Sequence, residues 1–242
     1  MLVEVWSDVV CPWCAIGRAH LTEALDRFEH ADEVEVVWRS FELDPHAPTE
    51  REGEYAALLA AKYGISPAEA QGMIDRMTQV AAGDGLDFRF DRVRPGNTFD
   101  AHRLLHLALE RGVQDELKVR LFEAYLTEGE PIGDRDTLAR LAGDVGLDAD
   151  EVAAVLDGER YADAVRADEA QAREYGISGV PFFVLDGRFG VSGAQPADVL
   201  LQGLRQAHAT ASPLAMVGAV AQDHAGHDHG TGDACADGSC AV

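Results

Sequence analysis

The 242-residue sequence is short of cysteine, lysine and positive charge: it has four cysteines, two lysines, and 20 basic residues against 43 acidic ones. The resulting formal net charge of −23 repels the phosphate backbone of a nucleic acid, so we expect no nucleic-acid partner. Long apolar runs are also missing, and none approaches the roughly 20 residues of a transmembrane helix. Because no charged leader with an apolar stretch and a cleavage site precedes the first expected strand, we expect a cytoplasmic protein without a membrane partner.

The hydrophobic fraction of 47% and the charged fraction of 26% are ordinary for a globular protein, and the length allows a sizeable core. The four cysteines form two close pairs, at positions 11 and 14 and at positions 235 and 240. Structural disulfides are rare in the cytoplasm, so a Cys-x-x-Cys pair in such a protein indicates catalysis rather than cross-linking.

The first pair, Cys11-Pro12-Trp13-Cys14, lies where an expected strand at 2–6 ends and an expected helix at 12–29 begins. The free amides and the positive end of a helix N-terminus stabilise an anion such as a thiolate, which favours Cys11 as the attacking group. Pro12 suits the first turn of a helix, where its missing N–H has no partner to lose. The two-residue spacer lets Cys14 attack a mixed disulfide formed at Cys11.

Two other interpretations of this motif are weaker. A zinc site would need a second Cys-x-x-Cys or a His-x-x-x-His at suitable spacing, and none lies nearby. An inert disulfide across so short a loop would constrain the unfolded chain very little. The sequence therefore favours a redox-active dithiol and no metal at this motif.

The remaining pattern predicts a second strand, a helical block and a final unit of two strands and a helix. Asp186-Gly187 between two apolar runs indicates a hairpin. The second strand is expected at 34–41, helices at 54–63, 66–82, 95–110, 114–127, 135–145, 149–156 and 161–175, strands at 182–185 and 188–191, and the last helix at 196–208. Residues 86–90 alternate and are expected to be extended.

This order divides the chain into three parts. Residues 1–50 and 160–210 form an α/β core, residues 51–159 form an inserted α-helical domain, and residues 211–242 form a flexible C-terminal tail with a Cys-x4-Cys.

The sequence resembles the DsbA-like thioredoxin superfamily. The motif at 11–14 after Ser7-Asp8-Val9-Val10, and Gly179-Val180-Pro181-Phe182-Phe183 far downstream, carry the resemblance. The stretch 86–102, with Pro95-Gly96-Asn97-Thr98, is similar to the cytoplasmic FrnE-like branch, which is related to 2-hydroxychromene-2-carboxylate isomerases and kappa-class glutathione transferases. The resemblance covers residues 1–208 and implies a thioredoxin-like fold with an inserted helical domain.

The resemblance also implies roles for residues outside the dithiol. Val180-Pro181 would form a cis-proline loop beside the cysteines, with the Val180 backbone pairing with an extended substrate segment. Trp13 would border the substrate groove, with a packed core aromatic as the alternative, and Asn97 would line the cleft from the helical side, with a helix cap as the alternative. Cys235 and Cys240 match a C-terminal Cys-x4-Cys of some FrnE-like proteins and would act as an auxiliary redox pair.

Other candidate groups have less support. Asp8 is predicted to cap its loop, with a proton-accepting role as the alternative. His102 and His106 lie one helical turn apart but have no evident third metal ligand. The tail cysteines could instead join His224, His227 and His229 in a zinc or copper site, or have no function.

We therefore expect a cytoplasmic disulfide oxidoreductase or isomerase that acts on cysteine-containing proteins and exchanges electrons with a cellular thiol reductant or oxidant. It would need no bound organic cofactor, and glutathione is a candidate redox partner. One alternative is a glutathione-dependent isomerase or transferase that acts on a small aromatic substrate. Relatives of that kind activate the glutathione thiol with a serine, and Cys14 argues against this alternative because a resolving thiol would discharge a mixed disulfide. The other is a non-catalytic chaperone or metal-binding protein. The sequence leaves the oligomeric state open.

Overall fold

The computed structural model describes residues 1–211, which form one compact unit. Its centre is a four-stranded sheet in the order β2-β1-β3-β4. Strand β1 (Leu2–Ser7) pairs in parallel with β2 (Glu35–Ser40) and antiparallel with β3 (Phe182–Leu185), which pairs with β4 (Phe189–Ser192). The dithiol thus follows a central strand.

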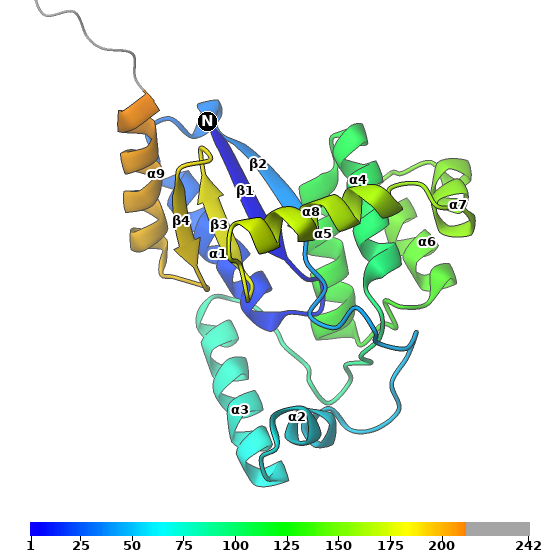
Figure 1. Cartoon of the computed structure of the whole chain (residues 1–242). Coiled ribbons are helices and arrows are strands. Elements are labelled where there is room, and N and C mark those ends of the chain that lie inside the picture. Colours follow the sequence, from blue (N-terminus) through cyan, green and yellow to red (C-terminus); the bar gives the residue numbers. More distant parts are fainter. Residues whose placement is uncertain (212–242) are drawn as a thin grey trace, which may run out of the picture. The chain divides into compact units, whose positions relative to one another are not determined.

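Helices cover both faces of the sheet. The side chains of β1 alternate between the two faces, and nearly all of them are buried as a result. Helices α1 (Pro12–Asp26) and α9 (Ala197–Ala211) share an apolar core with Val3 and Val5. Helix α8 (Ala162–Glu174) contributes Ala172 to a second core around Trp6, and Figure 1 shows it crossing the sheet.

Polar contacts fix α8 to the strands. The guanidinium of Arg39 donates to Glu4 at 2.9 and 2.6 Å and to Asp168 of α8 at 3.3 Å. Asp168 also accepts from the Ser40 amide at 2.8 Å. The buried carboxylates of Glu4 and Asp168 therefore both form ion pairs with Arg39 on β2.

The inserted residues form α2 (Tyr55–Tyr63), α3 (Pro67–Gly83), α4 (Phe99–Arg111), α5 (Gln114–Glu123), α6 (Arg135–Asp144) and α7 (Ala149–Asp157). Residues from α3 to α7 share one apolar core with Val9, Cys14 and Ile16 beside the dithiol. Whether the insert folds as a separate domain stays a prediction. None of the helices within residues 1–211 is both long and apolar enough to span a bilayer.

Local sequence signals account for several helix ends. Ser66 and Glu69 form the predicted capping box at the start of α3, and Gly64 ends α2 in the left-handed conformation. Asp186 and Gly187 have φ values of 53° and 65°, as a tight hairpin turn between β3 and β4 requires.

The structure corrects several predicted boundaries. Helix α1 ends at Asp26 rather than near residue 29, and a short 3₁₀ turn (Ala31–Glu33) follows it. Residues 86–90 lie outside the sheet, and their extended conformation stays a prediction. Helix α5 ends at Glu123, and a π-helical turn (Ala124–Glu128) continues it. Helix α4 begins at Phe99 instead of 95, because the backbone of 95–97 pairs with residues 48–51.

Candidate dithiol active site

Cys11 is the N-cap of α1. The turn after β1 is closed by a hydrogen bond from the Cys11 amide to the Asp8 carbonyl at 3.2 Å, and the Cys14 amide donates to the Cys11 carbonyl at 3.0 Å. Pro12 occupies the first helical turn, as predicted. The sulfur of Cys11 therefore sits at the positive end of α1.

The two thiols differ in access to solvent. Both are free, but Cys11 is 4% exposed and Cys14 is fully buried. Burial, followed by the hydrogen bond and the charge of Cys11, raises the pKa of Cys14 well above its ordinary value. Cys14 is thus a protonated thiol that lies deeper than the Cys11 sulfur.

The loop before β3 closes the other side of Cys11. The thiol of Cys11 donates to the Val180 carbonyl at 3.7 Å, and the Val180–Pro181 peptide bond is cis. Trp13, beside Cys11, has 42% of its surface exposed and is not a core aromatic. The structure thus brings Cys11, Cys14, Val180 and Pro181 together and leaves the Trp13 ring at the surface.

Gly17 allows this close approach. A Cβ at Gly17 would lie 2.9 Å from Cγ of Pro181 and 3.3 Å from Cζ of Phe183. The first distance is shorter than ordinary van der Waals contact, and the proline ring has little freedom to move. The absence of a side chain at Gly17 therefore sets the distance between α1 and the Pro181 loop.

A group of buried polar side chains lies beneath the dithiol: Asp8 from the turn after β1, His102 from α4 and Lys118 from α5. Asp8 accepts from the Leu43 amide at 2.8 Å and contacts Nε2 of His102 at 3.4 Å. Burial alone would raise the pKa of Asp8, but His102, the Leu43 amide and Lys118 together lower it. Burial lowers the pKa of His102 and outweighs the attraction of Asp8. Asp8 is therefore ionised and His102 neutral at pH 7.

Lys118 supplies the matching positive charge. Its Nζ is buried without a hydrogen-bond partner and lies 5.5 Å from the ring centre of Trp38 and 5.1 Å from that of Phe122. Burial lowers the pKa of Lys118 to about 8, while Cys14, Asp8 and Cys11 act in the opposite direction. Sequence reasoning missed this residue. The available signal was a lysine inside the apolar stripe Leu117, Leu121 and Phe122 of a buried helix.

The structure separates the proposed histidine pair and corrects the cap assigned to Asp8. The Asp8 side chain bonds to Leu43 rather than to its own turn. His102 faces Asp8, whereas Nε2 of His106 lies 3.2 Å from Asp168 and 3.1 Å from the Ser40 hydroxyl. Each imidazole has its own carboxylate, so the two do not converge on one metal.

Asn97 makes structural contacts. Its side chain donates to the Ala47 carbonyl at 3.2 Å and accepts from the Phe99 amide at 2.9 Å, and its backbone amide donates to the Pro48 carbonyl at 2.9 Å. A Cβ at the neighbouring Gly96 would lie 2.1 Å from the Thr49 carbonyl oxygen. Asn97 lines a polar depression of about 660 Å³ whose lining includes neither Cys11 nor Cys14. Its predicted contact with substrate stays a prediction.

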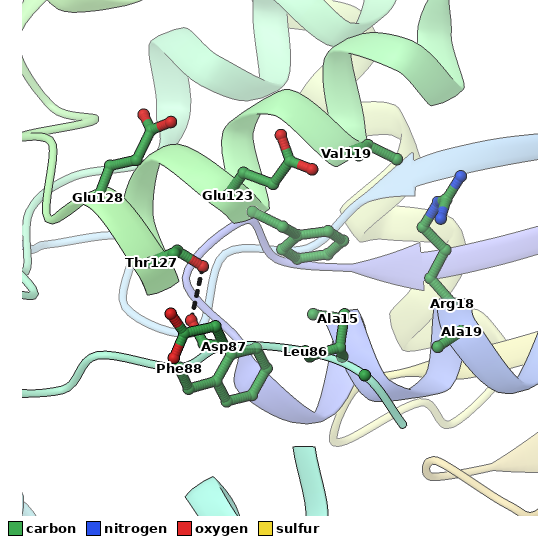
Figure 2. A pocket seen from close by; sticks show the side chains of 12 residues that line it. Ala15, Arg18, Ala19, Leu86, Asp87, Phe88, Val119, Glu123, Thr127 and Glu128 are labelled. Carbon is green, nitrogen blue, oxygen red and sulfur yellow. Dashed lines mark hydrogen bonds between the residues drawn. The ribbon is translucent and has the colours of Figure 1, made fainter. Parts of the chain in front are cut away.

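A second recess, of about 320 Å³, opens beside the first turns of α1 (Figure 2). Leu86, Phe88 and Phe122 give it apolar walls, and Thr127 closes one edge through a hydrogen bond to the Asp87 carbonyl at 2.7 Å. Arg18, Glu123 and Glu128 place charges along its lining. Neither cysteine lines it, so it borders the reacting site without being part of it. Cys235 and Cys240 lie outside the described residues.

Comparison with known proteins identifies the family. A family model of the DSBA-like thioredoxin domain matches residues 2–205, and the chain belongs to this family. The sequence is 31% identical over 199 residues to the uncharacterized protein YwbO of Bacillus subtilis, covering 81% of this chain and 92% of YwbO. These matches confirm the predicted DsbA-like resemblance.

Solved structures share the fold. The probable DsbA oxidoreductase SCO1869 from Streptomyces coelicolor is 48% identical, with a TM-score of 0.83 over 90% of this chain and 94% of that one. The cytosolic disulfide reductase DsbM from Pseudomonas aeruginosa has a TM-score of 0.60 at 18% identity, over 87% of this chain and all of DsbM. A 2-hydroxychromene-2-carboxylate isomerase has a TM-score of 0.62 at 14% identity, over 88% of this chain and all of that chain. The predicted thioredoxin-like α/β fold is confirmed.

Replacing Gly17 with alanine should move the Pro181 loop away from the dithiol. We expect Gly17→Ala to slow turnover of a disulfide substrate by about 10- to 100-fold, because a displacement near 1 Å misaligns the reacting groups. Global stability should change little, since overpacking and the better helix propensity of alanine oppose each other. The matched control is Gly72→Ala in α3, where a Cβ meets nothing within 4 Å. Equal turnover of Gly17→Ala and the parent would contradict this role.

Replacing Lys118 with methionine should stabilise the protein at neutral pH. The folded-state pKa of about 8 lies below the ordinary value of 10.5, so the folded protein binds fewer protons between these values and its stability rises with pH across that window. Below pH 8 the full cost of the buried charge is present, and Lys118→Met should remove up to about 3 kcal/mol of it. Urea unfolding at pH 7 and near pH 10 measures the gain, which should shrink at the higher pH.

The other lysine offers the matched control. Lys62 is exposed on α2, and Lys62→Met should leave the free energy of unfolding within about 0.5 kcal/mol of the parent at both pH values. A Lys118→Met protein that is less stable than the parent at pH 7 would show that the ammonium stabilises the fold.

Proposed function

We propose that this chain is a cytoplasmic thiol–disulfide oxidoreductase that reduces, forms or isomerises disulfides in protein substrates through Cys11 and Cys14. The observation that carries the proposal is the position of Cys11. Its sulfur lies at the N-terminus of α1 within hydrogen-bond distance of the Val180 carbonyl, with the buried thiol of Cys14 behind it. Membership of the DSBA-like thioredoxin domain family and the likeness to SCO1869 support it.

In the reducing direction the Cys11 thiolate attacks one sulfur of a substrate disulfide. The substrate S–S bond breaks, a mixed disulfide forms at Cys11, and the departing substrate thiolate takes up a proton. The Cys14 sulfur then attacks the Cys11 sulfur after losing its own proton. The second substrate thiol leaves, and a disulfide forms between Cys11 and Cys14. The dithiol is now oxidised, and two electrons and two protons have passed to the substrate.

Lys118 assists the second step. Cys14 must become a thiolate inside the core, and the positive charge of Lys118 lowers the pKa of Cys14 against the effects of burial and of Cys11. His102, the Leu43 amide and Lys118 keep the pKa of Asp8 low against the effect of burial. Lys118 thus acts as a positioning charge for the resolving thiolate and does not contact the substrate.

The Val180 loop offers a backbone for substrate recognition. Its carbonyl faces the Cys11 sulfur at 3.7 Å, while the Pro181 carbonyl is already occupied by the Gly193 amide at 2.9 Å. An extended substrate segment that pairs with Val180 would lie across Cys11, with the exposed Trp13 ring beside it. Main-chain recognition suits an enzyme that accepts many protein sequences.

Turnover in the reducing direction requires a cellular thiol reductant, for which glutathione is a candidate, to reopen the Cys11–Cys14 disulfide. Formation of substrate disulfides runs the same two exchanges in reverse and needs a thiol oxidant. Isomerisation needs neither, provided that Cys11 is reduced when it meets the substrate. The redox poise of the compartment therefore selects the direction.

The first test compares single cysteine variants in the reactivation of a scrambled, disulfide-containing protein with glutathione as reductant. Cys11→Ser should lose all measurable activity, because serine is a poor nucleophile toward sulfur. Cys14→Ser should retain the first step and accumulate a covalent complex with the substrate, visible on a non-reducing gel and dispersed by reductant. Full activity of Cys11→Ser would refute the proposed function and favour the small-molecule or chaperone alternatives.

The double variant Cys235→Ser/Cys240→Ser belongs in the same assay. An auxiliary role for this pair, which stays a prediction, requires the double variant to turn over more slowly than the parent while still forming the Cys11 complex. Unchanged turnover would remove the tail from the redox cycle and leave the role of Cys11 and Cys14 intact.

Lys118→Met should slow the second step selectively. Without the ammonium, the Cys14 thiolate is harder to form, so the mixed disulfide should live about 10-fold longer or more, whereas alkylation of Cys11 by a small reagent should slow by a smaller factor, because Cys14 interacts with Lys118 more strongly than Cys11 does. Rapid quenching with acid followed by mass spectrometry measures the lifetime. Raising the pH toward 9 should reduce the difference from the parent, and an unchanged lifetime at pH 7 would exclude the role of Lys118.

A further inference from the structure

A second set of ligand-type side chains lies outside the dithiol site. One ligand atom each from His30, Glu33 and His208 lie within 4.8 Å of one another. Nδ1 of His30 is 3.1 Å from Oε1 of Glu33, and Nε2 of His208 is 3.2 Å from Oε2 of the same carboxylate. His208 comes from the last turns of α9, about 175 residues from the other two, so only folding brings the three together.

This cluster, His30–Glu33–His208, is at the far end of the sheet from the cysteines. The terminal ammonium of Met1 donates to the Glu33 carbonyl at 2.6 Å, which places the cluster where β1 begins. The dithiol follows the opposite end of β1, six residues or about 20 Å along the strand. Figure 1 shows the chain's N-terminus and the end of α9 at the same end of the sheet.

The surrounding structure holds the three side chains in place. The two imidazole rings stack with their centres 3.9 Å apart and an angle of 16° between their planes. Both rings also contact the buried ring of Phe28 edge-on, each at 5.8 Å. The Glu33 backbone is fixed on both sides: its amide donates a hydrogen bond to the His30 carbonyl at 3.0 Å, and its carbonyl accepts one from the Met1 ammonium. Folding alone therefore brings the three side chains together.

We propose that the His30–Glu33–His208 cluster binds a divalent transition-metal ion of the Zn²⁺ class. Imidazole and carboxylate are ligands that such ions prefer, and two histidines with one carboxylate leave an open position for water. Zinc lies about 2.0–2.2 Å from nitrogen and oxygen ligands, so the donor atoms of a tetrahedral site are about 3.3 Å apart. The spacings of 3.1 and 3.2 Å, which end on the two different oxygens of the Glu33 carboxylate, are close to this value, and the three ligand atoms lie within 4.8 Å of one another. Binding requires the two stacked imidazole rings to turn so that both nitrogens face the ion.

Glu33 is the carboxylate of the cluster, and both histidines hydrogen-bond to it. Nearby, Glu29 is paired with Arg205, and the Met1 ammonium is engaged with a backbone carbonyl. Metal-bound histidine must be neutral, so binding competes with protons and weakens on acidification.

A bound ion would join the end of α9 to the turn before β2. Because the ligands converge only in the folded chain, metal should stabilise the native state by mass action. For a unit of about 200 residues, zinc at 100 times its dissociation constant should raise the melting temperature by about 5–10 °C. The effect should not depend on the dithiol, since the site lies at the other end of β1.

The experiment uses the full chain with its four cysteines replaced by serine, so that no thiolate competes for metal. Zinc binding is measured by isothermal titration calorimetry at pH 7.5, together with the melting temperature with and without zinc. We expect His208→Ala and Glu33→Gln each to weaken the binding of one equivalent of zinc at least 10-fold and to abolish the shift in melting temperature. Glu33→Gln keeps the size of the side chain, so it separates loss of a ligand from loss of the fold.

Two controls locate the ion. His46→Ala removes an exposed histidine outside the cluster and should bind zinc like the parent. The triple variant His224→Ala/His227→Ala/His229→Ala removes the histidines of the C-terminal segment and should retain the zinc-induced shift in melting temperature. Retention of that shift by both His208→Ala and Glu33→Gln, or its loss in the triple variant, would overturn the proposal.

Discussion

An ammonium group buried beside a buried thiol is the constraint on which the active site depends. Nζ of Lys118 has no hydrogen-bond partner and is surrounded by aromatic rings, so it is held at a cost to stability. The ionised Asp8 offsets this cost, and the sulfurs of Cys14 and Cys11 contribute to the same offset when they lose a proton. The proposed assistance to Cys14 would account for a charge kept in such surroundings, since a hydrophobic residue of similar volume commonly replaces a buried charge without loss of stability.

The same constraint explains why helices from the insert meet the core at the cysteines. Asp8 belongs to the turn after β1, whereas His102 and Lys118 come from α4 and α5. Enclosing these groups requires the apolar side chains of both parts to form one continuous core around Cys14. On the other side of the cysteines, the close contact between Gly17 and the Pro181 ring fixes the distance between α1 and the Pro181 loop. The fold is shared with a disulfide reductase and with an isomerase, so these side chains, and not the topology, carry the functional argument.

Local patterns predicted the elements that local interactions determine. The capping box at Ser66, the Asp186–Gly187 turn and the position of Cys11 at a helix start depend on a few neighbouring residues, and all are present. Several interactions across 35 residues or more escaped prediction. Pro95–Thr98 resembles a helix start, but its backbone pairs with residues 48–51, and the partners of Asp8 and the role of Lys118 depend on how α4 and α5 pack.

The origin of Lys118 in the insert has a consequence for engineering. Transplanting the segment from β1 to α1 into a plain thioredoxin scaffold would carry over the Cys-Pro-Trp-Cys sequence but leave behind the charge beneath Cys14. Such a chimera would present the right nucleophile with an altered resolving thiol. To keep these groups, α4 and α5 have to be transplanted together with α1. The smallest segment set that can be moved is therefore the three packed helices and not the four-residue motif.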